Sequence, residues 1–190
     1  MPFARRKTPY DVLSLYEYAV QALGRQMRSV AELKRLLRQR VAGQEDGHVM
    51  VEAVILKLKE QHYLNDTNYA AAYSSYRKEN EKFGKRRVIA DLKNKGVHSD
   101  IIEKTVNAAY AGVNEEKLAR AYLLKKRLEK PTDARQAARI FRTLARAGYS
   151  SRTIVAILKK WDVDDEVITN LECDAEWGEN LPAPRRNSDD

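Results

Sequence analysis

Four arginines in the C-terminal third of the chain are spaced by four, three and four residues: Arg135, Arg139, Arg142 and Arg146. A helix turns by ~100° per residue, so this spacing puts all four side chains on one face and the apolar residues of the same segment on the opposite face. Guanidinium groups bind phosphates and carboxylates through paired hydrogen bonds. This arginine row therefore predicts an exposed surface that binds a polyanion, the alternative being a helix face that contacts only water.

Six further cations join the predicted anion-binding set. An internal repeat, described below, aligns Arg142 and Arg146 with Lys34 and Arg38. The middle copy of the repeat has uncharged residues at these positions and supplies its cations from neighbouring ones. The full predicted set is the arginine row together with Lys34, Arg38, Lys85, Arg86, Arg87 and Lys93.

Residues that support catalysis or bind metals are sparse. The three histidines, His48, His62 and His98, stand in separate segments without carboxylate or cysteine partners at ligand spacing. The acids of residues 164–166 are consecutive, so their side chains point in different directions. The sequence also lacks the glycine-rich loop that binds nucleoside triphosphates and the G-x-S-x-G turn of serine hydrolases. We therefore expect no enzyme activity, no catalytic residue, no cofactor and no metal site.

Charge is distributed unevenly along the chain. The 190 residues include 35 Lys and Arg against 27 Asp and Glu, a formal net charge of +8. Residues 162–190 carry a net charge of −8, which leaves +16 on residues 1–161. A field of that size attracts DNA, RNA or an acidic protein assembly without choosing among them.

The composition favours a helical protein that stays in the cytosol. Hydrophobic residues make up 43% and charged residues 33%, with 8 Gly and 5 Pro, a combination that argues against collagen, low-complexity disorder and a turn-rich β-sandwich. No apolar stretch is long enough to span a membrane, and the basic N-terminus is not followed by the apolar segment of a secretory signal. The single cysteine, Cys173, agrees with a reducing compartment.

Apolar periodicity predicts nine helices and no strand between residues 10 and 161. The inner face of the first helix is expected at Leu13, Tyr16, Val20, Leu23 and Met27. That of the fourth is expected at Tyr69, Ala72, Tyr73 and Tyr76. Side chains that accept first-turn N–H groups predict N-caps at Ser29, Asp66, Ser99 and Asn114. Gly96 and Gly148 are expected to end helices in the left-handed conformation.

The predicted helices form an internal repeat. Seven residues between Ile89 and Val106 match residues between Phe141 and Leu158 at a constant offset of 52. The first copy matches the second at an offset of 56 over its middle helix. The fold class that follows is all-α: three tandem three-helix units of helix-turn-helix type in an elongated, curved array. The predicted divisions are a basic arm at 1–9, units at 10–66, 67–112 and 113–161, and a mobile acidic tail at 162–190.

Several short motifs in these units resemble those of a known family. They are the runs at residues 28–33, 63–66, 84–88 and 95–97, which read RSVAEL, YLND, GKRRV and KGV. In this order they are similar to the signatures of the bacterial regulatory protein RecX family, over roughly residues 10–161. The resemblance implies a regulator that binds the RecA recombinase filament on single-stranded DNA and restrains its growth, ATP hydrolysis and strand exchange. The acidic tail departs from the family pattern.

Aromatic residues and the tail each leave two interpretations open. Tyr69, Tyr73 and Tyr76 have the spacing of a buried helix face, which we favour over a stacking platform for unpaired bases. Trp161 is expected at the edge of the last core, whereas Trp177 is either a docking residue or an idle tail residue. The tail either competes with the polyanionic partner for the basic surface or only aids solubility.

Three classes of function remain at this point. The first is a monomeric regulator of a recombinase filament that contacts the RecA protein and single-stranded DNA, with double-stranded DNA as a further ligand. The second is a direct DNA-binding array of helix-turn-helix type without a recombinase partner. The third is a purely structural helical adaptor. An all-arginine row suits phosphates or carboxylates better than base readout, which favours the first class.

Overall fold

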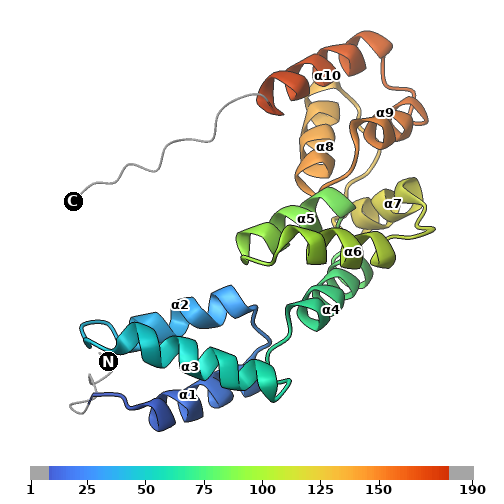
Figure 1. Ribbon diagram of the computed structural model, residues 1–190. Helices are drawn as coiled ribbons and strands as arrows, with labels where there is room; N and C mark the ends of the chain where they lie inside the picture. The colour runs from blue at the N-terminus through green and yellow to red at the C-terminus, as the bar shows by residue number, and fades with distance from the viewer. Residues whose placement is uncertain (1–8, 180–190) are drawn as a thin grey trace. The chain divides into compact units, whose positions relative to one another are not determined.

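Ten α-helices make up the part of the chain that the structure describes. The structure is a computed structural model, and it describes residues 9–179, with side chains described for residues 9–173. The predicted basic arm lies outside this range except for Pro9. The helices are α1 (Val12–Arg25), α2 (Val30–Arg40), α3 (Gly47–Glu60), α4 (Asp66–Glu79), α5 (Lys85–Asn94), α6 (Ser99–Ala109), α7 (Glu115–Lys125), α8 (Ala134–Arg146), α9 (Ser151–Lys159) and α10 (Asp165–Glu179) (Figure 1). No strand occurs in residues 9–179, so the predicted all-α class is confirmed.

The described chain divides into two units by its internal contacts. One runs up to Glu79 and includes Val88–Ala111, and the other holds Asn80–Arg87 and the residues from Gly112 onward. The division falls inside α5, because the two ends of this helix pack against different neighbours. None of the helices described is long and apolar enough to cross a membrane.

In the first unit, α1, α2 and α3 enclose one apolar core. Leu15, Leu33, Leu37, Val51 and Leu58 are fully buried in it. The start of α2 is well capped: the Ser29 hydroxyl accepts the Glu32 N–H while the Glu32 carboxylate accepts the Ser29 N–H, a reciprocal pair that satisfies two free donors.

The turn that follows α5 packs on the first turn of α2. Gly96 has φ +73°, and a Cβ atom at this position would lie 2.5 Å from the Cβ of Ala31. Beside it, the Ser29 hydroxyl donates to the Lys95 carbonyl, and the Lys95 ammonium lies 2.7 Å from Glu32 Oε1. Burial raises the pKa of Glu32, but the hydrogen bonds from Lys95 and from the Ser29 N–H outweigh it and leave the pKa below its ordinary value.

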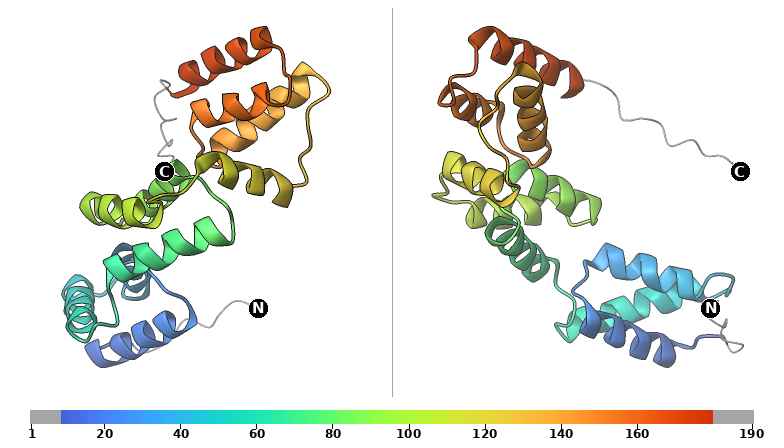
Figure 2. Two further views of the ribbon diagram at one scale, coloured as in Figure 1. Left: turned by 90° about the vertical axis from the view of Figure 1, so that its right-hand side faces the viewer. Right: turned by 180° about the vertical axis from the view of Figure 1, so that it is seen from behind.

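In the second unit, helices α7 to α10 enclose another apolar core. Ile140, Leu144, Ile154, Leu158 and Ile168 are buried there. Figure 2 shows α8, α9 and α10, coloured from light orange to red, as neighbouring helices. Two predictions are confirmed here: the inner face of α8 is the one expected, and Asn114 caps α7 by accepting the Lys117 N–H.

The first turn of α5 packs on the turn that follows α8. Gly148 has φ +89°, and a Cβ atom there would lie 2.2 Å from the Arg87 backbone nitrogen. The Gly84 N–H donates to the Ala147 carbonyl at 2.8 Å, and the Tyr149 hydroxyl donates to the Lys82 carbonyl. Both glycines predicted to end helices therefore do so, and each also admits a neighbouring helix at close range.

Two of the predicted N-caps are wrong. The Asn65 side chain caps α4 by accepting the N–H groups of Thr67 and Asn68. Asp66 is already helical and accepts the Val30 N–H instead. The N-cap of α6 is His98 rather than Ser99, whose hydroxyl donates to the Asp100 carboxylate.

The predicted inner faces of α1 and α4 are partly wrong. Leu13 and Met27 are 63% and 56% exposed, because α1 buries Leu15, Ala19 and Ala22. In α4 the buried set is Tyr69, Ala70 and Ser74, while Ala72 and Tyr76 face solvent. The reason is the same in both helices: small residues let a neighbouring helix approach closely, and the larger side chains lie around that contact.

The acidic segment is not a mobile tail over its first half. Residues 165–179 form α10, with Ile168 at 1% and Leu171 at 9% exposure in the second core. The Asp164 carboxylate accepts the Glu166 N–H at the start of this helix. The prediction failed because acidic residues surround the few apolar ones that supply the buried face. Residues 180–190 lie outside the described part, as does the side chain of Trp177.

Candidate functional site

The arginine row lies on the solvent face of α8. All four side chains are exposed, while Ala137, Ile140, Phe141 and Leu144 are buried on the opposite face. The twelve residues from Arg135 to Arg146 cover about 16 Å of helix axis. The row therefore forms a straight line of positive charge along the length of α8.

No described carboxylate pairs with the arginine row, in contrast to other cations of the second unit. Among the described residues, Lys125 pairs with Glu81 at 2.9 Å, Lys130 with Asp162 at 3.0 Å and Lys159 with Asp165 at 3.0 Å. Lys160 and Arg120 share Glu116, which lowers the pKa of that carboxyl. Four like charges on one face repel each other, so binding of an external anion stabilises the arginine row more than it stabilises a lysine that already has a carboxylate partner.

The C-terminal end of the row meets the first turn of α5. Because Gly148 lies against the backbone of Arg87, this turn is next to the end of α8 that carries Arg146. The predicted site residues Lys85, Arg86 and Arg87 are all exposed there. The structure thus brings seven of the ten predicted site residues into one unit, with three of them beside the end of the row.

Two of these three cations also have contacts within the protein. The Arg86 charge acts on Glu115, whose pKa is raised by burial but held below its ordinary value overall by hydrogen bonds from Ser150 and Thr153 and by Arg86. The Arg87 guanidinium lies 5.9 Å from the centroid of the Phe83 ring. Part of the charge at this turn therefore stabilises the fold.

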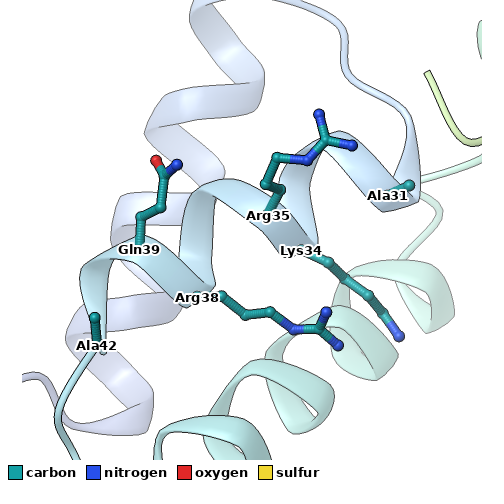
Figure 3. A pocket seen from close by; sticks show the side chains of 6 residues that line it. All are labelled: Ala31, Lys34, Arg35, Arg38, Gln39 and Ala42. Carbon is teal, nitrogen blue, oxygen red and sulfur yellow. The ribbon is translucent and has the colours of Figure 1, made fainter. Parts of the chain in front are cut away.

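A second basic face lies on α2 in the first unit. Its side chains line an open depression of about 500 Å³ that includes Lys34, Arg35 and Arg38. Lys34 and Arg38 extend toward α3, whereas Arg35 extends away from it (Figure 3). On α3, Glu52 lies 2.6 Å from the Lys34 ammonium and 3.5 Å from the Arg38 guanidinium, and these contacts lower the pKa of the Glu52 carboxyl.

The buried residues correct the repeat register that pointed to Lys34 and Arg38. Leu33 and Leu37 are buried in α2 as Val88 and Leu92 are in α5, and these pairs stand 55 residues apart rather than 56. The offset of 52 holds between α5 and α8, whose buried pair is Ile140 and Leu144.

With this register, the α2 counterparts of Arg142 and Arg146 are Arg35 and Gln39. Arg35 is exposed and has no carboxylate partner among the described residues. In both respects it is like the four arginines of the arginine row. Sequence reasoning missed it because the apolar pairs Leu36-Leu37 and Val88-Ile89 each allow two alignments. Lys93 is exposed on α5, in the part of that helix that belongs to the first unit.

Nothing in the described part of the chain forms a cluster of metal ligands. No group of three His, Cys, Asp or Glu side chains converges in this range. His48, His62 and His98 are all exposed. The His98 Nδ1 lies 3.5 Å from the Asp100 carboxylate, and His48 is near enough to Glu52 to help lower the pKa of that carboxyl.

Comparison with protein families and curated sequences gives consistent matches. Residues 65–106 match the model of a family described as "RecX, second three-helix domain". A "Regulatory protein RecX" of Pseudomonas syringae pv. tomato is 33% identical over 165 residues, which cover 86% of this chain and 96% of the relative. Proteins of the same description from Bacillus velezensis and Bacillus cereus are 34% and 28% identical, and the matched parts span 36% and 57% of their lengths.

Solved structures with the same fold carry the same description. A crystal structure of RecX from Lactobacillus salivarius aligns with a TM-score of 0.62 at 23% identity, over 80% of this chain and 96% of the other. A crystal structure of "regulatory protein RecX" aligns with a TM-score of 0.63 at 22% identity, over 78% and 71%. These two similarities establish the fold, while the sequence relatives above bear on the family.

Proposed function

The chain belongs to the RecX family of regulatory proteins, and from that membership we propose that it binds the RecA recombinase filament on single-stranded DNA and limits the filament's growth, ATP hydrolysis and strand exchange. In this proposal the protein acts by binding, without catalysis of its own. It belongs in the cytoplasm, where recombination and repair of the chromosome take place.

The arginine row is the observation that carries the proposal. A recombinase filament on DNA offers regularly spaced anions, the phosphates of the strand and the carboxylates of the protein surface. A line of four exposed guanidinium groups over about 16 Å has the length and the geometry to contact several of them at once. The cations at the first turn of α5 extend this line, and Arg35 offers the same contact from α2.

One titration tests the proposal. We expect ATP hydrolysis by RecA on single-stranded DNA to fall as the protein is added, with a steep loss of inhibition as salt rises, because phosphate contacts release counterions. Inhibition at a small fraction of the RecA concentration indicates that filament ends are blocked, and a stoichiometric requirement indicates that the filament is coated. ATP hydrolysis unchanged by an equimolar amount of protein contradicts the proposal.

A second measurement separates regulation of a filament from simple DNA binding. The affinity for RecA-coated single-stranded DNA should exceed that for the bare strand at the same ionic strength, because the coated strand adds protein contacts to the phosphates. Equal affinities for bare and coated strands would instead favour a direct DNA-binding array. Binding to neither, at any salt concentration, would leave a structural adaptor.

A further inference from the structure

A groove lined by tyrosines runs beside α4 in the first unit. It consists of two adjoining depressions of about 580 and 170 Å³, which share Met27 and Tyr69. Tyr73 and Tyr76 line the larger one and Tyr63 the smaller. We refer to these five residues and the space between them as the tyrosine groove. Its residues belong to the segment after α1, the loop before α4 and α4 itself, helices that can be followed in Figure 1, and none of them belongs to the arginine row.

The groove presents aromatic surface that the fold does not use. Tyr63 and Tyr76 are 62% and 55% exposed, and Met27 between them is 56% exposed. In the middle of the groove, the rings of Tyr69 and Tyr73 stack with centroids 6.0 Å apart and planes 27° apart. Large exposed apolar side chains gathered in one depression mark a binding surface, whereas single ones are ordinary.

Hydrogen bonds hold the two central rings in place. The Tyr69 hydroxyl lies 3.3 Å from the Glu32 carboxylate, and the Tyr73 hydroxyl donates to Asp91 at 3.1 Å. The stacked pair is therefore a fixed support, and the exposed rings of Tyr63 and Tyr76 lie at its two ends. From Tyr69 to Tyr76 the helix advances by about 10 Å.

The charged residues of the groove are all basic. Arg77 and Lys95 line the larger depression, and the Arg77 guanidinium lies 4.9 Å from the centroid of the Tyr73 ring. Arg28 lines the smaller depression, and its buried Nε has no hydrogen-bond partner among the described residues. No Asp or Glu lines either depression. A guanidinium carries further N–H donors besides Nε, so an oxygen acceptor of a ligand in the smaller depression can pair with Arg28.

We propose that the tyrosine groove binds unpaired bases of single-stranded DNA, which stack on the exposed rings while a phosphate or base oxygen accepts from Arg28. Aromatic rings with interleaved cations are the usual platform for single strands, because every unpaired base has a free face. In a duplex those faces are covered by the neighbouring base pairs. The identification of the strand as DNA rests on the proposed function, whereas base stacking itself rests only on the groove.

Two labelled oligonucleotides test the proposal with the full-length protein. One is a 20-nucleotide dT strand, and the other has the same length with abasic sites throughout, so both carry the same phosphates. Base–aromatic stacking predicts that fluorescence anisotropy shows the dT strand bound at least about fivefold more tightly. The double variant Tyr63→Ala/Tyr76→Ala should bring this ratio close to one, and Tyr76→Phe should retain it.

Matched controls distinguish the groove from a general loss of structure. Leu56→Ala and Leu124→Ala also remove large exposed side chains, 59% and 80% exposed, outside the groove, and should leave the ratio unchanged. A wild-type ratio of one, or a ratio that survives the double variant, overturns the proposal. If the ratio is one while the double variant still weakens inhibition of RecA, the groove contacts the recombinase instead of bases.

Failure of the groove and failure of the proposed function give different results. A protein that prefers the dT strand, loses this preference with the double variant and leaves RecA activity unchanged retains the stacking groove but not the recombinase function. A protein that inhibits RecA while binding both strands equally retains the function but not the groove.

Discussion

Replacing Gly148 with alanine should destabilise the second unit more than replacing any glycine in open space. Gly148 has φ +89°, where an L-residue is strained, and its Cβ would lie 2.2 Å from the Arg87 nitrogen and 2.5 Å from the Arg87 Cβ. The left-handed conformation costs a non-glycine residue ~1 kcal/mol. Since the nearest atom belongs to the backbone, relief requires α5 to shift, and such overpacking adds about 1–3 kcal/mol. We expect a total loss of about 3 kcal/mol in the free energy of unfolding.

Gly112 provides the matched control for this prediction. It has φ +68° in the same unit, and no other atom lies within 4 Å of its virtual Cβ, so Gly112→Ala should cost only the ~1 kcal/mol of strain. Urea unfolding followed by tryptophan fluorescence reports on this unit, because both tryptophans of the chain, Trp161 and Trp177, belong to it. Equal losses for Gly148→Ala and Gly112→Ala would refute the close contact between the α8–α9 turn and α5.

The helix contacts and the charges also determine how substitutions at Glu32, at Ile168 and in the arginine row should act. The folded-state pKa of Glu32 lies below its ordinary value of 4.5, so its carboxylate stabilises the fold at neutral pH and stops doing so as the pH falls through the folded-state pKa. Glu32→Gln should therefore lower the free energy of unfolding by about 2 kcal/mol at pH 7 and by less at pH 3. Urea unfolding at the two pH values measures both losses. Ile168→Ala should lower the free energy of unfolding by about 3 kcal/mol, because Ile168 is buried, and Thr169→Ala by less than about 0.5 kcal/mol, because Thr169 is exposed. Similar losses for the two variants would show that α10 does not pack in the core. Arg139→Gln/Arg142→Gln should reduce the slope of log affinity for single-stranded DNA against log salt by about 1.4, and an unchanged slope would mean that the two arginines touch no phosphate.

The arginine-bearing helix was predictable because its two faces differ so sharply. Ala137, Ile140, Phe141 and Leu144 alternate with the arginines at helical spacing, so periodicity alone fixed which side faces solvent. The end of this helix at Gly148 was equally predictable, since a glycine after an apolar helical run indicates a helix end in the left-handed conformation. The close approach of α5 to that glycine was not predictable, because the residue that it contacts, Arg87, lies 61 residues earlier in the chain.

Elsewhere the sequence allowed more than one solution, and packing selected among them. Adjacent apolar residues in α2 and α5 permitted offsets of 55 and 56, and burial of Leu37 rather than Leu36 decides for 55. In α4, tyrosines at helical spacing suggested a buried stripe, but the small residues Ala70 and Ser74 form the buried contact and leave Tyr76 exposed. The helical state of α10 was hidden by its acids, since few apolar residues are needed to dock a helix at the edge of a core.

The central claim is that the arginine row binds the RecA filament, and charge reversal within the row tests it most directly. Arg139→Glu/Arg142→Glu changes the net charge by −4, and the control Lys117→Glu/Arg152→Glu makes the same change at exposed positions of the same unit, in the first turns of α7 and α9 where acids are tolerated. The measurement is the rate of ATP hydrolysis by RecA on single-stranded DNA as each protein is titrated. We predict that the concentration of the row variant required for half-inhibition rises at least tenfold, on the order of 1.4 kcal/mol in binding free energy. The concentration of the control variant required should stay within about threefold of that of the wild type. Equal inhibition by the row variant and the control would contradict the claim and leave the row as a face that contacts only solvent.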